Sequence, residues 1–222
     1  MKKNILYIFT CLLFTGCNKE AKLQYKYTDQ DDLFSCSSTN MELIKESVYA
    51  FEDYLKEYYS FKGPKSVETG LMNYWRTAMT KRLPAIEYIN PHIIKVRDAL
   101  KKEENLWITK NNFTTLNYNH PILKCISNEI KDPEVKKLFD FLIESKTFKT
   151  KVFLASMTMN DKRVKDDKGF ETYLALDTFY ARILNVNFND LEENIKANKE
   201  TARKEFEENS GKIIEGDLEP IK

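Results

Sequence analysis

The side chains best suited to bind a metal ion are the two histidines, His92 and His120. A helical zinc site needs paired ligands on one face, as in H-E-x-x-H. Neither histidine has a histidine or cysteine partner at such a spacing. His92 follows Pro91 at an expected helix start, and His120 directly precedes Pro121. We therefore expect no metal site, and we assign both histidines to helix starts or to solvent.

Most carboxylates fall on polar faces of expected helices, and Asp177 is an exception. It shares a helix side with Tyr173, Tyr180 and Leu184, so it is expected to point inward. A buried carboxylate needs partners, which Arg182 or Tyr180 could supply. The favoured interpretation is a structural hydrogen bond, and the alternative is a general base or a ligand contact.

Other candidates for catalysis are few. Arg76 and Glu87 form a second candidate pair, no serine lies in a G-x-S-x-G motif, and we find no cofactor motif. An enzyme would require titratable groups to converge in one cleft, such as Asp177 with His92 or His120. The sequence therefore predicts no catalytic residue and no cofactor.

The N-terminus has the pattern of an export signal. Residues 1–4 form a short, positively charged segment, and residues 5–14 are uncharged and mostly apolar. Ten such residues are too few to span a bilayer, which takes about 20. Leu13-Phe14-Thr15-Gly16-Cys17 then resembles the lipobox of bacterial type II signal peptides, although that family prefers leucine at the position of Phe14. The alternative is an ordinary secretory signal with a chance cysteine behind it.

The resemblance implies a bacterial lipoprotein precursor in which residues 1–16 are the signal peptide. Cys17 would become the N-terminus and carry a diacylglycerol, usually with a third acyl chain such as palmitate. Each buried methylene contributes about 0.8 kcal/mol, so two or three chains give a lasting anchor. Asn18 differs from the aspartate that resembles an inner-membrane retention signal. We therefore expect the chain outside the cytoplasm, on the outer membrane if the organism has one.

Two cysteines, Cys36 and Cys125, remain in the expected mature chain. Exported proteins can keep disulfides, so the two thiols could pair. Alternatively, Cys125 is a plain buried thiol on an apolar helix, and Cys36 is a reactive thiol before a helix N-terminus. The sequence leaves these alternatives open.

Composition excludes several classes of protein. The hydrophobic share is 42% and the aromatic share 13%, which opposes disorder, while six glycines and six prolines favour helices over a turn-rich β fold. Removing Lys2 and Lys3 with the signal leaves 33 basic against 34 acidic side chains. Without a basic excess, we expect no nucleic-acid partner.

The mature chain reads as one all-α domain of about six or seven helices. Residues 17–38 are expected to form the lipidated tether and lead-in, 39–188 the helical domain, 189–210 a charged surface helix and 211–222 a loose tail. Within the lead-in, Leu23, Tyr25 and Tyr27 alternate with polar residues. This alternation fits either a short strand or an extended strap packed on the body.

Helix starts are marked along the domain. Thr39 with Glu42 forms a capping box, and Ser66, Asn90-Pro91 and Asp132-Pro133 mark later starts. Pro84 should kink or split the second helical segment.

Two further segments complete the domain. Residues 109–119 carry four asparagines and are expected to form a polar loop. The helix that begins near residue 133 is expected to run to residue 142 and either stop there or continue through Ala155.

These features favour a lipid-anchored cell-envelope protein that binds another protein, either an envelope component or a toxin, without catalysis. The membrane would be contacted through the lipid. The alternatives are a small-molecule-binding lipoprotein accessory to uptake and an envelope enzyme with an unrecognised site. Crowded aromatics such as Tyr54, Tyr58 and Tyr59 fit either an interface or, more simply, a core.

Overall fold

The computed structural model describes residues 23–37, 39–60, 64–80, 82–111, 113–146, 148–157, 166–188 and 190. The expected signal peptide, the lipidated Cys17 and the loose tail lie outside these residues. Of the expected charged helix at 189–210, only Asp190 is described.

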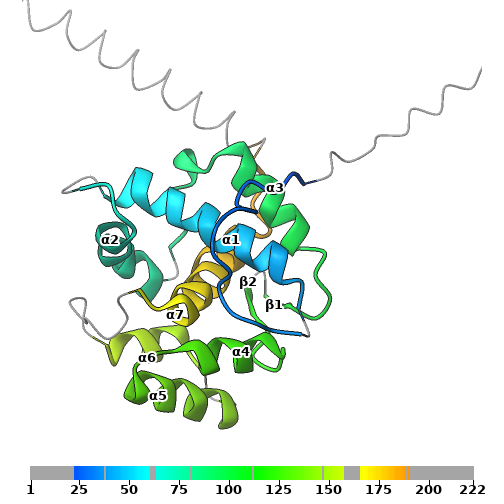
Figure 1. Ribbon diagram of the computed structural model, residues 1–222. Coiled ribbons are helices and arrows are strands. Elements are labelled where there is room, and N and C mark those ends of the chain that lie inside the picture. Colours follow the sequence, from blue (N-terminus) through cyan, green and yellow to red (C-terminus); the bar gives the residue numbers. More distant parts are fainter. Residues whose placement is uncertain are drawn as a thin grey trace, which may run out of the picture.

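The described part of the chain is mostly helical, which confirms the predicted all-α class (Figure 1). The α-helices are α1 (Met41–Tyr54), α2 (Val67–Met79), α3 (Pro91–Leu100), α4 (Ile122–Glu129), α5 (Pro133–Glu144), α6 (Thr150–Ala155), α7 (Lys168–Tyr173) and α8 (Ala181–Ile183). The remaining elements are two π-helical segments (Leu55–Tyr59 and Leu174–Tyr180), a 3-10 turn (Ile86–Tyr88) and the strands β1 (Trp107–Lys110) and β2 (Phe113–Leu116).

A buried central helix organises these elements. It is made of α7, the second π-helical segment and α8, and it contacts α1 on one side, while α7 contacts α4 on another (Figure 1). Its large side chains Phe170, Tyr173 and Phe179 are fully buried, as are Ile44 and Phe51 of α1. The apolar core therefore joins the two ends of the described chain.

Three predicted helix starts are confirmed by their caps. The Ser66 side chain accepts a hydrogen bond from the Thr69 amide, and Asn90 accepts one from the Ile93 amide. Asp132 accepts from two amides at the start of α5. Each cap satisfies amide groups that lack partners inside the helix.

The capping residue of α1 is Asn40, and the prediction of Thr39 was wrong by one position. Asn40 Oδ1 lies 3.3 Å from the Leu43 amide nitrogen. The Thr39 hydroxyl instead lies 3.8 Å from Cys36 Sγ. Both side chains can cap a helix, and the path of the chain around Cys36 decides between them.

Pro84 splits the second helical segment, as predicted. Helix α2 ends at Met79, and the next helical turn is the 3-10 turn at Ile86–Tyr88. Proline has no amide proton and its ring obstructs the preceding turn, so one continuous helix is excluded.

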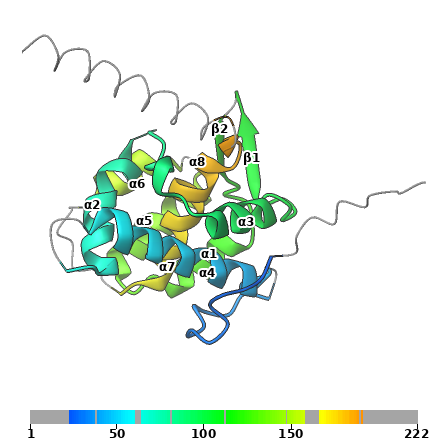
Figure 2. The ribbon, with the colours of Figure 1, turned by 90° about the horizontal axis from the view of Figure 1, so that it is seen from above.

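The predicted polar loop at 109–119 is in fact mostly a β-hairpin, which Figure 2 shows at one edge of the molecule. Trp107 pairs with Leu116, and Lys110 pairs with Phe113. The prediction gave the asparagines too much weight, because aromatic and β-branched residues flank them on both sides. Asn111, with φ of 49°, lies at the turn, where asparagine tolerates a left-handed backbone.

The helix that begins at residue 133 was expected either to stop near residue 142 or to continue through Ala155, and the structure shows that it stops. Helix α5 ends at Glu144 and α6 begins at Thr150. Lys146 has φ of 55°, so the backbone leaves the helical path just after the cap at Ser145.

Candidate functional site

The lead-in at 23–37 forms an extended strap that crosses α1 and reaches α4 (Figures 1 and 2). It contains no strand, so the second of the two interpretations of its alternating pattern is correct. We call this segment the strap.

A buried carboxylate fastens the strap to α1. Glu46 is 1% exposed, and its oxygens accept hydrogen bonds from the amides of Lys26 (2.7 Å) and Tyr27 (3.1 Å). His92 Nε2 lies 2.6 Å from the same carboxylate. Burial lowers the pKa of His92 more than its hydrogen bond to Glu46 raises it, so the ring is neutral at pH 7. The two strap amides and His92 therefore satisfy the hydrogen bonds of the Glu46 carboxylate.

Side chains reinforce this attachment. The Tyr27 hydroxyl donates to Asp53 Oδ2 at 2.7 Å. Burial raises the pKa of Tyr27, and the hydrogen bond to the Asp53 carboxylate raises it further. Lys45 Nζ donates to the Thr28 carbonyl at 3.2 Å and to Asp32 at 3.1 Å. The strap therefore remains on α1 through both main-chain and side-chain contacts.

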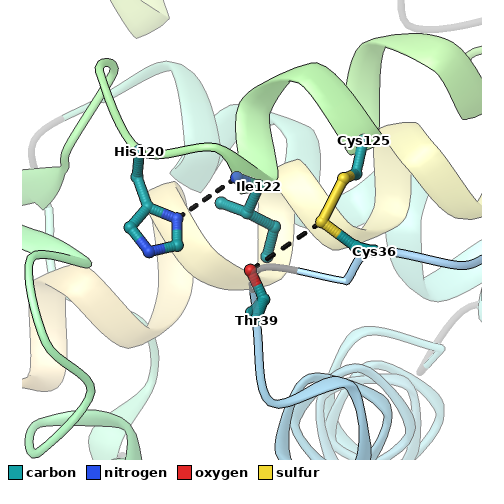
Figure 3. The surroundings of a disulfide bond; sticks show 5 residues. All are labelled: Cys36, Thr39, His120, Ile122 and Cys125. Carbon is teal, nitrogen blue, oxygen red and sulfur yellow. Dashed lines mark hydrogen bonds between the residues drawn. A yellow bond between two sulfur atoms is a disulfide. The ribbon is translucent and has the colours of Figure 1, made fainter.

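A disulfide fixes the far end of the strap. Cys36 and Cys125 of α4 are bonded, with Cα atoms 5.7 Å apart and 89 residues apart in the chain (Figure 3). His120 lies near this bond in the same view, and its Nδ1 accepts a hydrogen bond from the Ile122 amide at 3.2 Å. The structure thus joins the two thiols whose pairing the sequence left open.

A pocket of about 590 Å³ lies between the strap and the first half of α1. We call it the strap pocket. Tyr25, Tyr27, Phe34 and Met41, all half-buried, provide much of its apolar wall. Its position follows from the strap, because both fastenings, at Glu46 and at Cys36, contribute to the lining.

The charged lining of the strap pocket is mainly acidic. It consists of Asp32, Glu42 and Glu46 against a single base, Lys45. Glu42 is exposed, whereas the Lys45 side chain is only 13% exposed and is paired with Asp32.

A second charged cluster lies where α1 meets α7. Lys168 forms ion pairs with Glu52 and with Glu171, the latter at 2.8 Å, and its ammonium lies 5.2 Å from the centre of the Tyr49 ring. Glu52 is 6% and Glu171 is 4% exposed. Burial raises the pKa of Glu171 to about 7; Lys168 lowers it, and the Glu52 charge raises it further. One ammonium cannot balance two ionised carboxylates, and the raised pKa of Glu171 follows from burial together with this imbalance.

Asp177 is buried, as predicted, but its predicted partners were wrong. Its carboxylate accepts hydrogen bonds from the hydroxyls of Tyr118, Tyr173 and Thr150 and from the Leu116 amide. The hairpin brings Leu116 and Tyr118 to it, and this contact was not predictable while that segment was taken for a loop. The four donors make the carboxylate a structural junction.

Arg182, one of the proposed partners, instead donates to carbonyls at the end of α2, including those of Thr77 and Ala78. Tyr180, the other, donates to the Ser47 carbonyl at 3.2 Å. Arg76 and Glu87, the second candidate pair, are both exposed, so they are unlike the buried Asp177.

The histidines differ in their surroundings. His120 lies at a helix start, as predicted, where it accepts a hydrogen bond from the Ile122 amide, but the side chain of His92 is buried against Glu46 and serves neither of the two expected roles. Neither is among the hydrogen-bond partners of Asp177. Within the described ranges, no group of three or more histidine, cysteine, aspartate or glutamate side chains could hold a metal ion.

The crowded aromatics divide between core and surface. Tyr54, Tyr59 and Tyr74 are buried and in edge contact, with ring centroids 5.2 to 5.8 Å apart. Tyr58 packs on Tyr88, which is 54% exposed. The simpler interpretation, a core, therefore describes most of this group.

Sequence analysis missed the buried acids Glu46, Glu52 and Glu171 because it placed such residues on polar faces. A signal was present: a second stripe along α1, Leu43, Ser47, Ala50 and Tyr54, runs beside the apolar one. Apolar and small residues at that spacing, beside a first apolar stripe, indicate a helix that is covered on more than one side. All four residues are buried in the structure.

Comparisons with protein-family models, with curated proteins and with solved structures found no match to this chain. Among the described residues, no helix combines the length and the apolar character needed to cross a bilayer.

Proposed function

We propose that this chain is a lipid-anchored cell-envelope protein that binds another protein, without catalysis, through the strap pocket. The observation that carries the proposal is the pocket itself, which is open to solvent and held in shape by Glu46 and by the disulfide. A preformed, mostly apolar hollow with a few charged groups is typical of a recognition site.

The proposed anchor places this pocket close to the membrane. Five residues lie between Cys17 and Leu23, the first residue of the strap, and the six residue steps can span at most about 20 Å. The strap is therefore the part of the folded body that the lipid holds nearest to the bilayer. An envelope partner at the same surface would meet the pocket first.

The disulfide supports a site outside the cytoplasm. Disulfides persist in oxidising compartments and are rare where thioredoxin and glutathione keep thiols reduced. The Cys36–Cys125 bond therefore agrees with export through an N-terminal signal.

A small-molecule ligand is the second candidate. The strap-pocket volume of about 590 Å³ falls within the range of about 300–1,000 Å³ that is usual for such sites. A metabolite that co-purifies with the chain and is lost when the pocket is blocked would favour this candidate.

Photo-cross-linking in intact cells tests the protein partner. A photoreactive residue at Thr28, which is exposed and lines the strap pocket, should give one abundant cross-linked protein. The matched control carries the same residue at Phe141, which is 63% exposed on α5 and is not part of the pocket lining. Equal labelling of abundant neighbours from both positions would contradict the proposed role.

The anchor is tested separately by metabolic labelling with a palmitate analogue. The wild-type chain should carry the label and sediment with membranes. Cys17→Ser should lose both properties, whereas Cys11→Ser should keep them. Labelling of Cys17→Ser would show that the lipid is attached elsewhere, and an unlabelled wild-type chain would contradict the proposed anchor.

A further inference from the structure

We propose that the strap pocket receives the side chain of a lysine or an arginine from the partner protein. This inference rests on the proposed function and specifies the chemistry of its partner. It is carried by the juxtaposition of exposed carboxylate charge and half-buried aromatic rings in one pocket.

The lining of the strap pocket carries more negative than positive side chains. Three carboxylates, those of Asp32, Glu42 and Glu46, face one ammonium, that of Lys45. Lys45 is already held by the Thr28 carbonyl and Asp32, so it is not free to attract an anion. His92, the neighbour of Glu46, is a weak source of opposing positive charge, because burial holds its pKa below the ordinary value. The acidic side chains of the lining therefore outnumber the basic one, which favours a cation over an anion.

The surroundings of Tyr25 support the same sign of potential. Burial raises the pKa of Tyr25, and the nearby carboxylates of Glu42, Glu103 and Glu46 raise it further, while a hydrogen bond with Asn40 lowers it. The three charges that contribute most to this shift are therefore negative.

Aromatic rings in the pocket lining are a second feature that suits a cation. Tyr25, Tyr27 and Phe34 line the pocket and are only half-buried, so part of each side chain remains accessible. A guanidinium or ammonium group is attracted to the face of such a ring, and its aliphatic stem can pack beside Met41. Asp32 and Glu42 are both exposed, but Asp32 is paired with Lys45, so Glu42 is the carboxylate proposed to pair with the charged end.

The size of the pocket is compatible with one long side chain and part of its backbone. At about 590 Å³ it exceeds the needs of a single ammonium ion. Its open side faces solvent, so an extended segment of a partner can place one residue in it while the main chain stays outside.

The test uses the full chain in non-ionic detergent and short capped peptides with no terminal charge. Four peptides are identical except for a central arginine, lysine, citrulline or norleucine, and binding is measured by ligand-observed NMR. We expect the arginine and lysine peptides to bind, and the citrulline and norleucine peptides to bind at least about tenfold more weakly. Raising the NaCl concentration should weaken the binding of the two cationic peptides and leave the binding of the two neutral peptides unchanged.

The matched variants are Glu42→Gln and Glu144→Gln, the latter an exposed glutamate at the end of α5. Glu42→Gln should weaken the binding of the arginine peptide by about three- to tenfold, and Glu144→Gln should leave this binding unchanged. Both substitutions are on exposed positions, so folding is preserved, and unfolding curves verify this. Equal effects of the two variants, or equal affinity for citrulline and arginine, would overturn the inference.

Free n-butylguanidine separates a protein side chain from a soluble amine. Weaker binding of this compound than of the arginine peptide supports a protein source, and equal or tighter binding overturns it. If Thr28 cross-links to a partner but no cationic peptide binds, the proposed function stands and the cationic inference fails. If cationic peptides bind but Thr28 captures no partner, the recognition chemistry stands and the proposed function fails.

Discussion

Lys168 Nζ lies 2.8 Å from Glu171 Oε2, and the same ammonium forms a second ion pair with Glu52 of α1. Because two buried carboxylates share one ammonium, burial and the charge of Glu52 raise the pKa of Glu171 to about 7. Its ordinary value is 4.5. The folded protein therefore binds a proton at this site more tightly than the unfolded chain does.

This relationship predicts a stability loss with rising pH. The contribution of Glu171 is fully present below about pH 4.5 and is lost as the pH rises through about 7, by about 1–3 kcal/mol. Glu171→Gln, which cannot ionise, should remove this part of the pH dependence in urea unfolding at pH 5 and pH 8. Groups such as His92 titrate in both proteins and cancel in the difference. Parallel pH profiles for the two proteins would contradict the prediction.

Glu46→Gln should loosen the strap. The substitution replaces one carboxylate oxygen by an NH2 group, which donates and cannot accept, so the side chain can no longer accept from the Lys26 and Tyr27 amides with two separate oxygens. Hydrogen exchange at those two amides should accelerate by about tenfold. Glu42→Gln, on the same helix but exposed, should leave their exchange unchanged. Unchanged exchange in Glu46→Gln would mean that other contacts hold the strap.

The disulfide should contribute strongly to stability. A cross-link between residues 89 positions apart contributes about 4–5 kcal/mol on the chain-entropy model. Reduction with dithiothreitol should lower the free energy of unfolding of the wild type by several kcal/mol. The double variant Cys36→Ser, Cys125→Ser should resemble the reduced wild type and be insensitive to the reagent. A reductant effect of the same size in the double variant would assign the loss to something else.

Asp177→Asn should destabilise the junction between the hairpin and the central helix. An amide presents two donors to a site that already supplies four, so about 2–4 kcal/mol should be lost in urea unfolding. Tyr118→Phe removes one donor only and should cost about 1 kcal/mol. The prediction fails if the two variants are equally stable.

Gly70→Ala should also destabilise, although alanine is the better helix former by about 1 kcal/mol. A Cβ atom at this position would lie 2.5 Å from the Leu55 carbonyl oxygen, in the backbone of the first π-helical segment. The clash should exceed the helical gain and cost about 2–3 kcal/mol net in thermal or urea unfolding. Met72→Ala, at an exposed position of the same helix, should cost less than about 1 kcal/mol. A stabilised Gly70→Ala would show that the two helical segments can separate without loss.

The sequence by itself determined the helical class, three of the helix starts and the break at Pro84. These features depend on bonds between residues three or four apart, so caps such as Ser66 and Asn90 can be identified locally. The tertiary structure alone decided the partners of Asp177, the burial of Glu46, Glu52 and Glu171, and the disulfide. Each of these joins segments that are far apart in the chain, and local spacing carries no information about which segments will meet.

The hairpin shows the same limit on a smaller scale. Its strands are four residues long, and the asparagines at 111 and 112 carry the turn signal of a loop and of a hairpin equally well. Packing of β2 against α8 and the second π-helical segment favours the paired form. The strap pocket, too, exists only because Glu46 and Cys125 hold the strap across α1, and a pocket formed by two fastenings becomes visible only when the chain is folded.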